Sequence, residues 1–349
     1  MLVASIYNCV GISFSTLDRL LQAAISHRAI NGRAVDLGEK APRGGFGLAE
    51  HVQRVACPNS AGDGSIGGMT LRRQLFESVA RRQYRQQGYH VFRGTFPGED
   101  IEVIADMVRS MVPGYGGEIR RQDGKFAAND FFPGTRLIRN PVLHPHVSLP
   151  EELDPLSAKL RALLTTPVLA SRLRELDGVK HYVIHQSLLF FAAQTTELHL
   201  DSWSVDTAPL GQSHTVWIPL QHLDHRSGVP SVIPWPSGKV VTESELRLRQ
   251  IGSREQRYDE YHRALRKMML DRSPEAVAPL LRMGDVIVWS SLTPHFTLPA
   301  QPFPTERLSL QVLIRPAANR WGDFLSQPYD QTSVQLERVT KYFSIRLVT

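Results

Sequence analysis

The chain has 349 residues and 42% hydrophobic content, enough to bury a large core in one catalytic domain with additions to it. Its 40 Lys and Arg residues outnumber 34 Asp and Glu residues, and this net charge of +6 is scattered along the chain. We therefore expect no nucleic-acid partner and favour a small-molecule substrate that is anionic. The two cysteines, Cys9 and Cys57, indicate neither a disulfide framework nor a cysteine metal site, and a reducing cytoplasm is the expected compartment.

Residues 1–68 are predicted to be a glycine-rich, poorly ordered N-terminal extension. They hold 10 of the 25 glycines and only three aromatic residues, so they have little material for a core. Ser15 to Ile30 is typical of a short amphipathic helix. No basic segment precedes the apolar stretch Met1 to Val10, and no apolar run reaches the roughly 18 residues of a membrane span. We expect neither a signal peptide nor a membrane anchor.

Residues 69–349 are predicted to form the functional domain, and helices come first in it. A helix is expected from Met69 to Gln87, with a solvated arginine face at positions 72, 73, 81, 82 and 85. A strand at Tyr89–Arg93 follows. Further helices are expected at Glu99–Met111, Asp154–Leu164 and Pro167–Leu176. The pair His144 and His146 is flanked by prolines at 141, 145 and 150, so we predict a surface loop there.

The hydrophobic period then changes to that of strands. Strands are predicted at 181–192, 197–202, 215–220, 231–233, 285–290 and 307–315. One charged, helical insertion, residues 242–281, interrupts them and is predicted to cover the site as a lid or to pack outside the sheets. The fold class is therefore mainly β with flanking helices (α+β).

The residues that suggest chemistry lie among these strands. His199 and Asp201 are two residues apart, and on a strand this spacing points both side chains to one face. The strand at Val286–Trp289 delivers His295 just beyond its end. Two imidazoles and one carboxylate form a facial triad, which leaves coordination positions open and suits non-haem Fe(II). Arg307, twelve residues after His295, is placed to hold an anionic co-substrate. An isolated His-x-Asp also arises by chance among 13 histidines, so the strand context carries the prediction.

Several of these segments resemble the phytanoyl-CoA dioxygenase family of Fe(II)/2-oxoglutarate oxygenases, which includes ectoine hydroxylase. The resemblance runs from about Met69 to Pro316. It rests on Gly88-Tyr89-His90-Val91-Phe92-Arg93, on His199-x-Asp201, on Trp217-Ile218-Pro219-Leu220 and on Ser227-Gly228-Val229-Pro230-Ser231-Val232-Ile233-Pro234. The family's Pro-Gly-Ser-His turn reads Pro234-Trp235-Pro236-Ser237-Gly238 here.

The resemblance implies a double-stranded β-helix (jelly roll, cupin-like) with Fe(II) held by His199, Asp201 and His295, which are then the catalytic residues. It also implies that 2-oxoglutarate chelates the iron beside O2 and is held by Arg307 and Thr297. Two further side chains, those of Trp217 and Gln186, are expected to face the co-substrate.

The expected activity is hydroxylation of an unactivated C–H bond of a small metabolite, with release of succinate and CO2. Asp201 occupies the position that a small residue takes in related halogenating enzymes, so we expect hydroxylation rather than halogenation. The alternative is a non-catalytic or metal-binding jelly-roll protein. The sequence leaves open the identity of the substrate and whether desaturation or cyclisation replaces hydroxylation.

Overall fold

A computed structural model describes residues 77–224, 226–249, 252–272, 274–297, 300, 302–322 and 346–348. The predictions for the extension 1–68, for the helix at 15–30 and for both cysteines lie outside the described residues. The first part of the helix predicted from Met69 also lies outside them.

Five α-helices are described, and local signals set their ends. They are α3 (Val79–Gln87), α4 (Gly98–Met111), α5 (Asp154–Leu164), α6 (Pro167–Asp177) and α7 (Arg254–Arg272), with a short 3-10 turn η1 (Glu151–Leu153) before α5. The Thr166 side chain caps α6 by accepting the Leu169 N–H, and Pro167 occupies the first helical position, where no N–H is needed. Gly178 ends α6 with φ 82°, a conformation that favours glycine.

A seven-stranded antiparallel sheet forms the larger layer. Its order is β1 (Tyr89–Phe92), β10 (Val286–Ser290), β8 (His214–Pro219), β12 (Glu306–Pro316), β5 (His181–Ala192) and β14 (Arg346–Val348), with β4 (Val142–Leu143) also paired to β5. Two two-stranded sheets lie apart from it: β2 (Ile119–Arg120) with β3 (Phe126–Ala127), and β7 (Asp206–Ala208) with β13 (Arg320–Gly322).

The second layer is a sheet of β6 (Thr196–His199), β11 (His295–Thr297) and β9 (Pro230–Val232), and Val277 adds a bridge to Val232. Along the chain, β5, β6, β8, β9, β10, β11 and β12 alternate between the larger and the smaller sheet. This alternation is the topology of a jelly roll, so the expected fold class is confirmed, although the sheets do not close into a barrel.

The two faces of the larger sheet have different partners, because successive side chains on a strand point to opposite faces. Val216, Val288 and Val312 lie side by side across β8, β10 and β12 and are buried in the core that includes residues of α4, α5 and α6. Trp217 and Trp289 point the other way and pack with the smaller sheet's Val232 and its neighbours. The space between the two sheets is thus lined by the side chains that alternate with the helix-facing ones.

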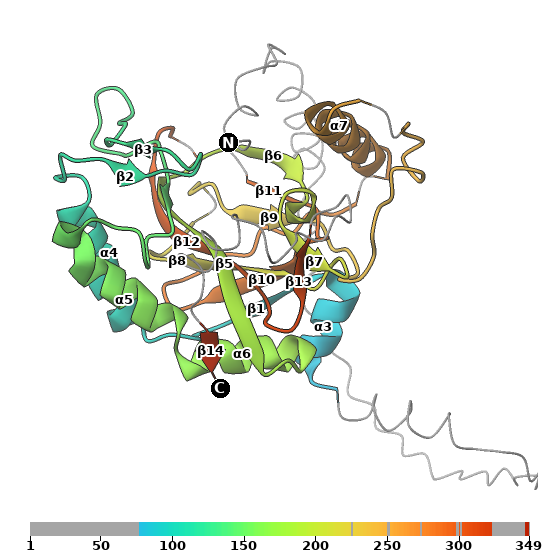
Figure 1. Ribbon diagram of the computed structural model, residues 1–349, viewed down its shortest axis with the longest axis horizontal. Coiled ribbons are helices and arrows are strands. Elements are labelled where there is room, and N and C mark those ends of the chain that lie inside the picture. The colour runs from blue at the N-terminus through green and yellow to red at the C-terminus, as the bar shows by residue number, and fades with distance from the viewer. Residues whose placement is uncertain are drawn as a thin grey trace, which may run out of the picture. The chain divides into compact units, whose positions relative to one another are not determined.

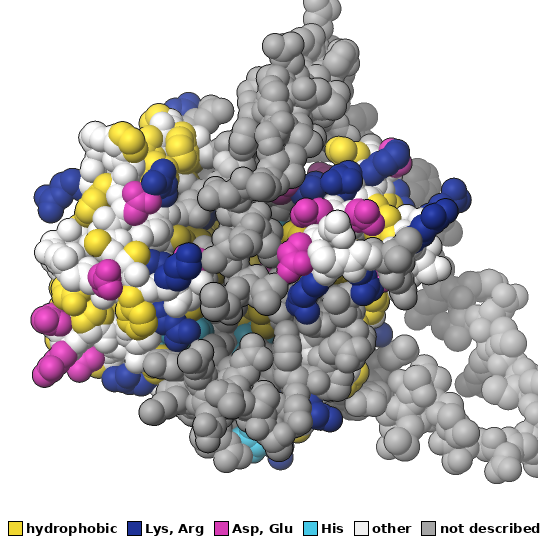
Figure 2. All heavy atoms as spheres, turned by 45° about the horizontal axis from the view of Figure 1, so that its top comes forward, with side chains coloured by type: hydrophobic (Ala, Val, Ile, Leu, Met, Phe, Trp, Pro, Cys, Tyr) yellow, Lys and Arg dark blue, Asp and Glu magenta, His cyan; other side chains and the backbone are white. Residues whose placement is uncertain are grey.

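Figure 1 shows α4, α5 and α6 together on one side of the sheets and α7 on another, close to β6. On the face drawn in Figure 2, basic side chains are interspersed with acidic ones. Among the described residues, no helix combines the length and apolar character needed to cross a membrane.

Three predictions outside the candidate site need correction. His144 and His146 are buried, 2% and 0% exposed, because the backbone of residue 144 pairs with Ser187 of β5 and His146 Nδ1 lies 2.7 Å from the Ser187 hydroxyl. Prolines mark this segment as a loop but do not determine its depth. The guanidinium of Arg81 is not simply solvated, since it donates to the backbone oxygens of Glu175 and Arg174 at the end of α6. In the described part of the insertion (242–249, 252–272 and 274–281), α7 is the only α-helix.

Candidate metal centre

His199, Asp201 and His295 converge, with one ligand atom of each lying within 4.8 Å of the others. His199 ends β6 and lies directly opposite His295, the first residue of β11, so the pairing of the two strands brings the imidazoles together. Their ring centroids are 4.2 Å apart. Asp201 Oδ1 lies 3.8 Å from His199 Nε2 and 3.6 Å from His295 Nε2. This is the only such group of possible metal ligands among the described residues.

Asp201 enters the site by a route that differs from the predicted one. The strand expected over 197–202 ends at His199, and Asp201 begins a 3-10 turn, η2 (Asp201–Trp203). The turn forms because the N–H groups of Ser204 and Val205 both bond to the Asp201 carbonyl, while Ser202 N–H bonds to Ser291 of the loop before His295. The two-residue spacing therefore brings the groups together through a strand followed by a turn, not through one strand face.

The two carboxylate oxygens of Asp201 have separate partners. Oδ2 accepts the Thr215 hydroxyl at 2.6 Å and the Trp289 indole N–H at 3.1 Å. Oδ1 faces the two imidazole Nε2 atoms. A carboxylate with two donors on one oxygen is fixed in rotation, which leaves the other oxygen directed at the point between the histidines.

Both histidines are held in the tautomer that binds a metal through Nε2. His199 Nδ1 donates to the Glu197 carbonyl at 2.8 Å, and His295 Nδ1 donates to the Thr293 carbonyl at 2.9 Å. A carbonyl can only accept, so Nδ1 carries the proton and the Nε2 lone pair faces Asp201. Backbone carbonyls commonly orient metal-binding histidines in this way.

The charge states agree with this arrangement. Burial, and then the nearby His295, lower the pKa of His199 to about 4, so its imidazole is neutral at pH 7. For Asp201 the pKa is lowered: burial acts to raise it, but the neighbouring histidines and the bonds from Thr215 and Trp289 outweigh burial. A neutral imidazole beside an ionised carboxylate, with a second imidazole facing the same carboxylate, is a donor set that suits a divalent first-row metal.

A close backbone approach shapes the loop that delivers His295. Gly88 has φ 75°, and a Cβ there would lie 2.1 Å from the Trp235 carbonyl oxygen and 2.4 Å from the Thr293 hydroxyl. The Gly88 carbonyl accepts the Ser290 N–H and the Thr293 hydroxyl, each at 2.8 Å. Only glycine allows this contact, which fixes the turn just before His295.

Arg307 lies buried between the sheets, 3% exposed. Its guanidinium donates to the Gly228 carbonyl and lies 5.8 Å from the centre of the Trp217 ring. Its Nε atom has no hydrogen-bond partner, and no carboxylate among the described residues pairs with it. Burial lowers the pKa of Arg307 to about 10, so it remains charged at neutral pH. A buried cation without an anion is unfavourable, and a bound carboxylate would remove this penalty.

The other predicted co-substrate residues are placed as follows. Trp217 lies between the sheets, with the Arg307 guanidinium 5.8 Å from the centre of its ring. Gln186 lies on β5 opposite Leu313 of β12, half-buried. Thr297 pairs with Thr196 and Pro230, and among the described residues it makes no hydrogen bond with Arg307. The structure thus brings Trp217 and Arg307 together, and within its described residues no hydrogen bond joins Thr297 or Gln186 to either of them.

Sequence reasoning missed the residues that support Asp201 and Arg307. Thr215 is two residues before Trp217, so strand alternation places both between the sheets, but only the fold shows that Thr215 reaches Asp201. Ser309 is two residues after Arg307, is 0% exposed and has a hydroxyl without a hydrogen-bond partner in the described part of the chain. The position of Ser309 two residues after Arg307 on a predicted strand could have indicated that both side chains lie on one face.

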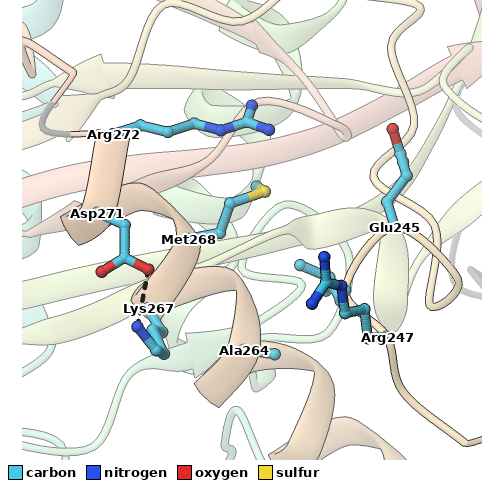
Figure 3. A pocket seen from close by; sticks show the side chains of 8 residues that line it. Glu245, Arg247, Ala264, Lys267, Met268, Asp271 and Arg272 are labelled. Atoms are coloured by element: carbon cyan, nitrogen blue, oxygen red, sulfur yellow. Dashed lines mark hydrogen bonds and ion pairs between the residues drawn. The ribbon is translucent and has the colours of Figure 1, made fainter.

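A cavity of about 440 Å³ lies elsewhere, between α7 and the turn around Arg247. Figure 3 shows its lining, with Lys267 and Asp271 joined in an ion pair on the helix and Glu245 and Arg247 on the turn. None of the triad residues, and no residue of either sheet, lines it. We assign no chemistry to this cavity.

A model of the family described as phytanoyl-CoA dioxygenase (PhyH) matches residues 84–301. Among solved structures, the chain is similar to the non-haem α-ketoglutarate-dependent carbocyclase SnoK from nogalamycin biosynthesis, with 18% identity, a TM-score of 0.50, and coverage of 76% of this chain and 91% of that one. EctD from S. alaskensis with bound Fe gives 18% identity, a TM-score of 0.49, and coverage of 70% and 78%. No match was found among curated proteins. At these identities the likeness to SnoK shows a shared fold.

Proposed function

The chain belongs to the phytanoyl-CoA dioxygenase family of Fe(II)- and 2-oxoglutarate-dependent oxygenases, and we propose that His199, Asp201 and His295 hold its iron. The observation that supports this assignment is the convergence of Asp201 Oδ1 with two imidazole Nε2 atoms whose Nδ1 protons are engaged by carbonyls. Three ligands from one side leave the remaining positions for the co-substrate and dioxygen. Thr215 and Trp289 keep the Asp201 carboxylate oriented.

We propose that Arg307 binds the distal carboxylate of 2-oxoglutarate. The guanidinium is buried and charged, and it has no acidic partner among the described residues. Charge-assisted bonds between a guanidinium and a carboxylate are strong in such a setting. Ser309, on the same strand face, would supply a hydroxyl donor, and the Trp217 ring would form the wall between this end and the iron ligands. Thr297 and Gln186 remain proposed co-substrate neighbours.

We propose that the reaction is hydroxylation of a C–H bond in a small, anionic metabolite. When bound, the iron and 2-oxoglutarate activate dioxygen: one oxygen atom enters succinate, formed with CO2 from 2-oxoglutarate, and the other enters the substrate as hydroxyl. The protein's part is to orient the two groups and to exclude water from the space between the sheets. Since Asp201 retains the carboxylate position, hydroxyl transfer is expected over halogenation.

The experiment is reconstitution of the full chain with Fe(II) and 2-oxoglutarate without oxygen, followed by exposure to oxygen and a screen of small anionic metabolites. A substrate is recognised by an increase in succinate and by a product heavier by one oxygen atom. The proposal is wrong if the metal-loaded chain forms no succinate, either with any compound of the screen or on exposure to oxygen without a compound.

A further inference from the structure

Helix α7 lies along the segment that carries two of the three iron ligands. Arg254, near its start, donates to the Trp203 carbonyl at 3.3 Å, and Arg266, three turns later, forms an ion pair with Glu197. Between them, His262 contacts the backbone of Leu200. The helix therefore runs antiparallel to residues 197–203 and is joined to both ends and to the middle of that segment. Figure 1 shows the same proximity of α7 and β6.

His262 is buried, 1% exposed, and both of its ring nitrogens are used. Nδ1 lies 2.9 Å from the Tyr258 carbonyl, one turn back on the helix, and Nε2 lies 3.4 Å from the Leu200 backbone nitrogen. A carbonyl only accepts and a backbone N–H only donates, so the ring must be the neutral tautomer with its proton on Nδ1. His262 thus accepts a hydrogen bond from the backbone N–H of Leu200, the residue between the two proposed ligands His199 and Asp201.

The side chain of Leu200 is held by the same helix. It is 2% exposed and belongs to an apolar cluster that includes Tyr261, Leu265 and Met269 of α7. Both the backbone and the side chain of the residue between the two ligands are therefore fixed by the insertion. On the other side of His199, the carbonyl of Glu197 orients the His199 ring, while the carboxylate of Glu197 pairs with Arg266.

We propose that the insertion helix α7 positions the iron-ligand segment and that His262 is the positioning residue, acting through the Leu200 N–H on the orientation of His199 and Asp201. This inference rests on the proposed iron site. It assigns α7 a role in metal binding, in addition to the two roles predicted for the insertion, a lid over the site or packing outside the sheets. Removing the His262 acceptor leaves a buried N–H without a partner, and the segment then relaxes at the point where the two ligands join it.

Metal affinity is the property to measure, because a helix that only stabilises the fold would not change it. We expect His262→Ala to weaken Mn(II) binding by about tenfold in anaerobic calorimetry without 2-oxoglutarate, the size of effect typical for groups that orient metal ligands. His262→Gln carries an amide oxygen at about the reach of Nε2, so it is expected to restore most of the affinity. Arg266→Met, a change at a half-exposed position that leaves the buried core intact, is expected to weaken binding by a smaller factor.

Two control variants lie on the same helix. Tyr261→Phe removes the hydrogen bond from Tyr261 to the Val241 carbonyl, so it lowers the thermal midpoint while leaving Mn(II) affinity unchanged. Arg263→Ala, at an exposed position, is expected to change neither property. If the unaltered chain binds no metal, the proposed iron site is wrong. If the unaltered chain binds metal and His262→Ala or Arg266→Met binds it equally well, the positioning role is overturned. The positioning role is also overturned if Tyr261→Phe weakens binding as much as these variants do. In both cases the iron site stands.

Discussion

The Thr215 hydroxyl donates to Asp201 Oδ2 over 2.6 Å, so the carboxylate is held on one side by the larger sheet and presents its other oxygen to the two histidines. Trp289, on the adjacent strand opposite Thr215, adds a second donor. The orientation of Asp201, the acidic member of the proposed triad, is therefore set by side chains of β8 and β10.

Thr215→Val replaces the hydroxyl by a methyl group of similar size and leaves Asp201 Oδ2 with one donor. We expect Fe(II) or Mn(II) affinity to fall by about tenfold while the thermal midpoint changes little, because outer partners of metal ligands have effects of this size. Calorimetric titration measures it. Thr215→Ser, which keeps the hydroxyl, serves as the control, and equal affinities for all three proteins would show that this hydrogen bond does not orient the ligand.

Arg307→Ala removes the buried guanidinium that we assign to the co-substrate carboxylate. Truncation of one partner of a buried charge pair typically costs about 2–5 kcal/mol, so the concentration of 2-oxoglutarate needed for half-maximal turnover should rise at least about 30-fold. Metal affinity should be retained, because Arg307 is not among the converging ligands. Steady-state succinate formation at varied 2-oxoglutarate measures the change, and an unaltered dependence would remove Arg307 from the site.

Buried neutral histidines predict a loss of stability in mild acid. Burial and the nearby Arg161 lower the pKa of His146 to about 4, while an unfolded histidine titrates near 6.5. Between about pH 6.5 and 4 the unfolded chain binds a proton that the folded chain does not, so the free energy of unfolding falls as pH falls, by up to about 1.4 kcal/mol per pH unit for this group.

His146→Asn offers the test, since asparagine can still bond to Ser187 but does not titrate. Urea unfolding of metal-free protein at pH 7.5 and at pH 5 is expected to show a smaller loss of stability for the variant than for the unaltered chain. Equal losses would mean that His146 is not the buried neutral group described here.

Residues 1–68 contribute none of the proposed ligands, and we propose that a chain beginning at Met69 retains fold and turnover. Thermal unfolding and succinate formation, each compared with the full chain, measure this. Insolubility of the shortened chain, or loss of 2-oxoglutarate turnover, would show that the extension is required.

The elements with local end signals are predictable from the sequence almost to the residue. The expected α5 matches the observed Asp154–Leu164, and α6 is extended by one residue to Asp177, because a proline lies in the first two positions of each helix and Gly178 ends the second. The fold class follows from the change of hydrophobic period after α6. The local sequence of a segment does not specify how deeply the segment is buried. For this reason the segment around His144 and His146 is predicted to lie on the surface, although it is buried.

Some features of the candidate site are likewise predictable from the sequence, and others are not. The short motif of His199 and Asp201 can be found by its spacing, and His295 by its position after a strand. The contacts that orient them depend on the register between strands and on packing, such as His199 opposite His295 or Thr215 reaching Asp201. The role of His262 depends on where α7 lies relative to β6, which no periodicity within the helix specifies.

The most direct test of the iron site is anaerobic Fe(II) titration of the full chain beside Asp201→Ala and His295→Ala, followed by 2-oxoglutarate. The unaltered chain should bind one Fe(II) and then show the visible charge-transfer absorption of a chelated 2-oxo acid, and both variants should lose the metal and the absorption while remaining folded. Fe(II) binding of undiminished affinity in both variants, with the absorption retained, would contradict the assignment of His199, Asp201 and His295 as the metal centre.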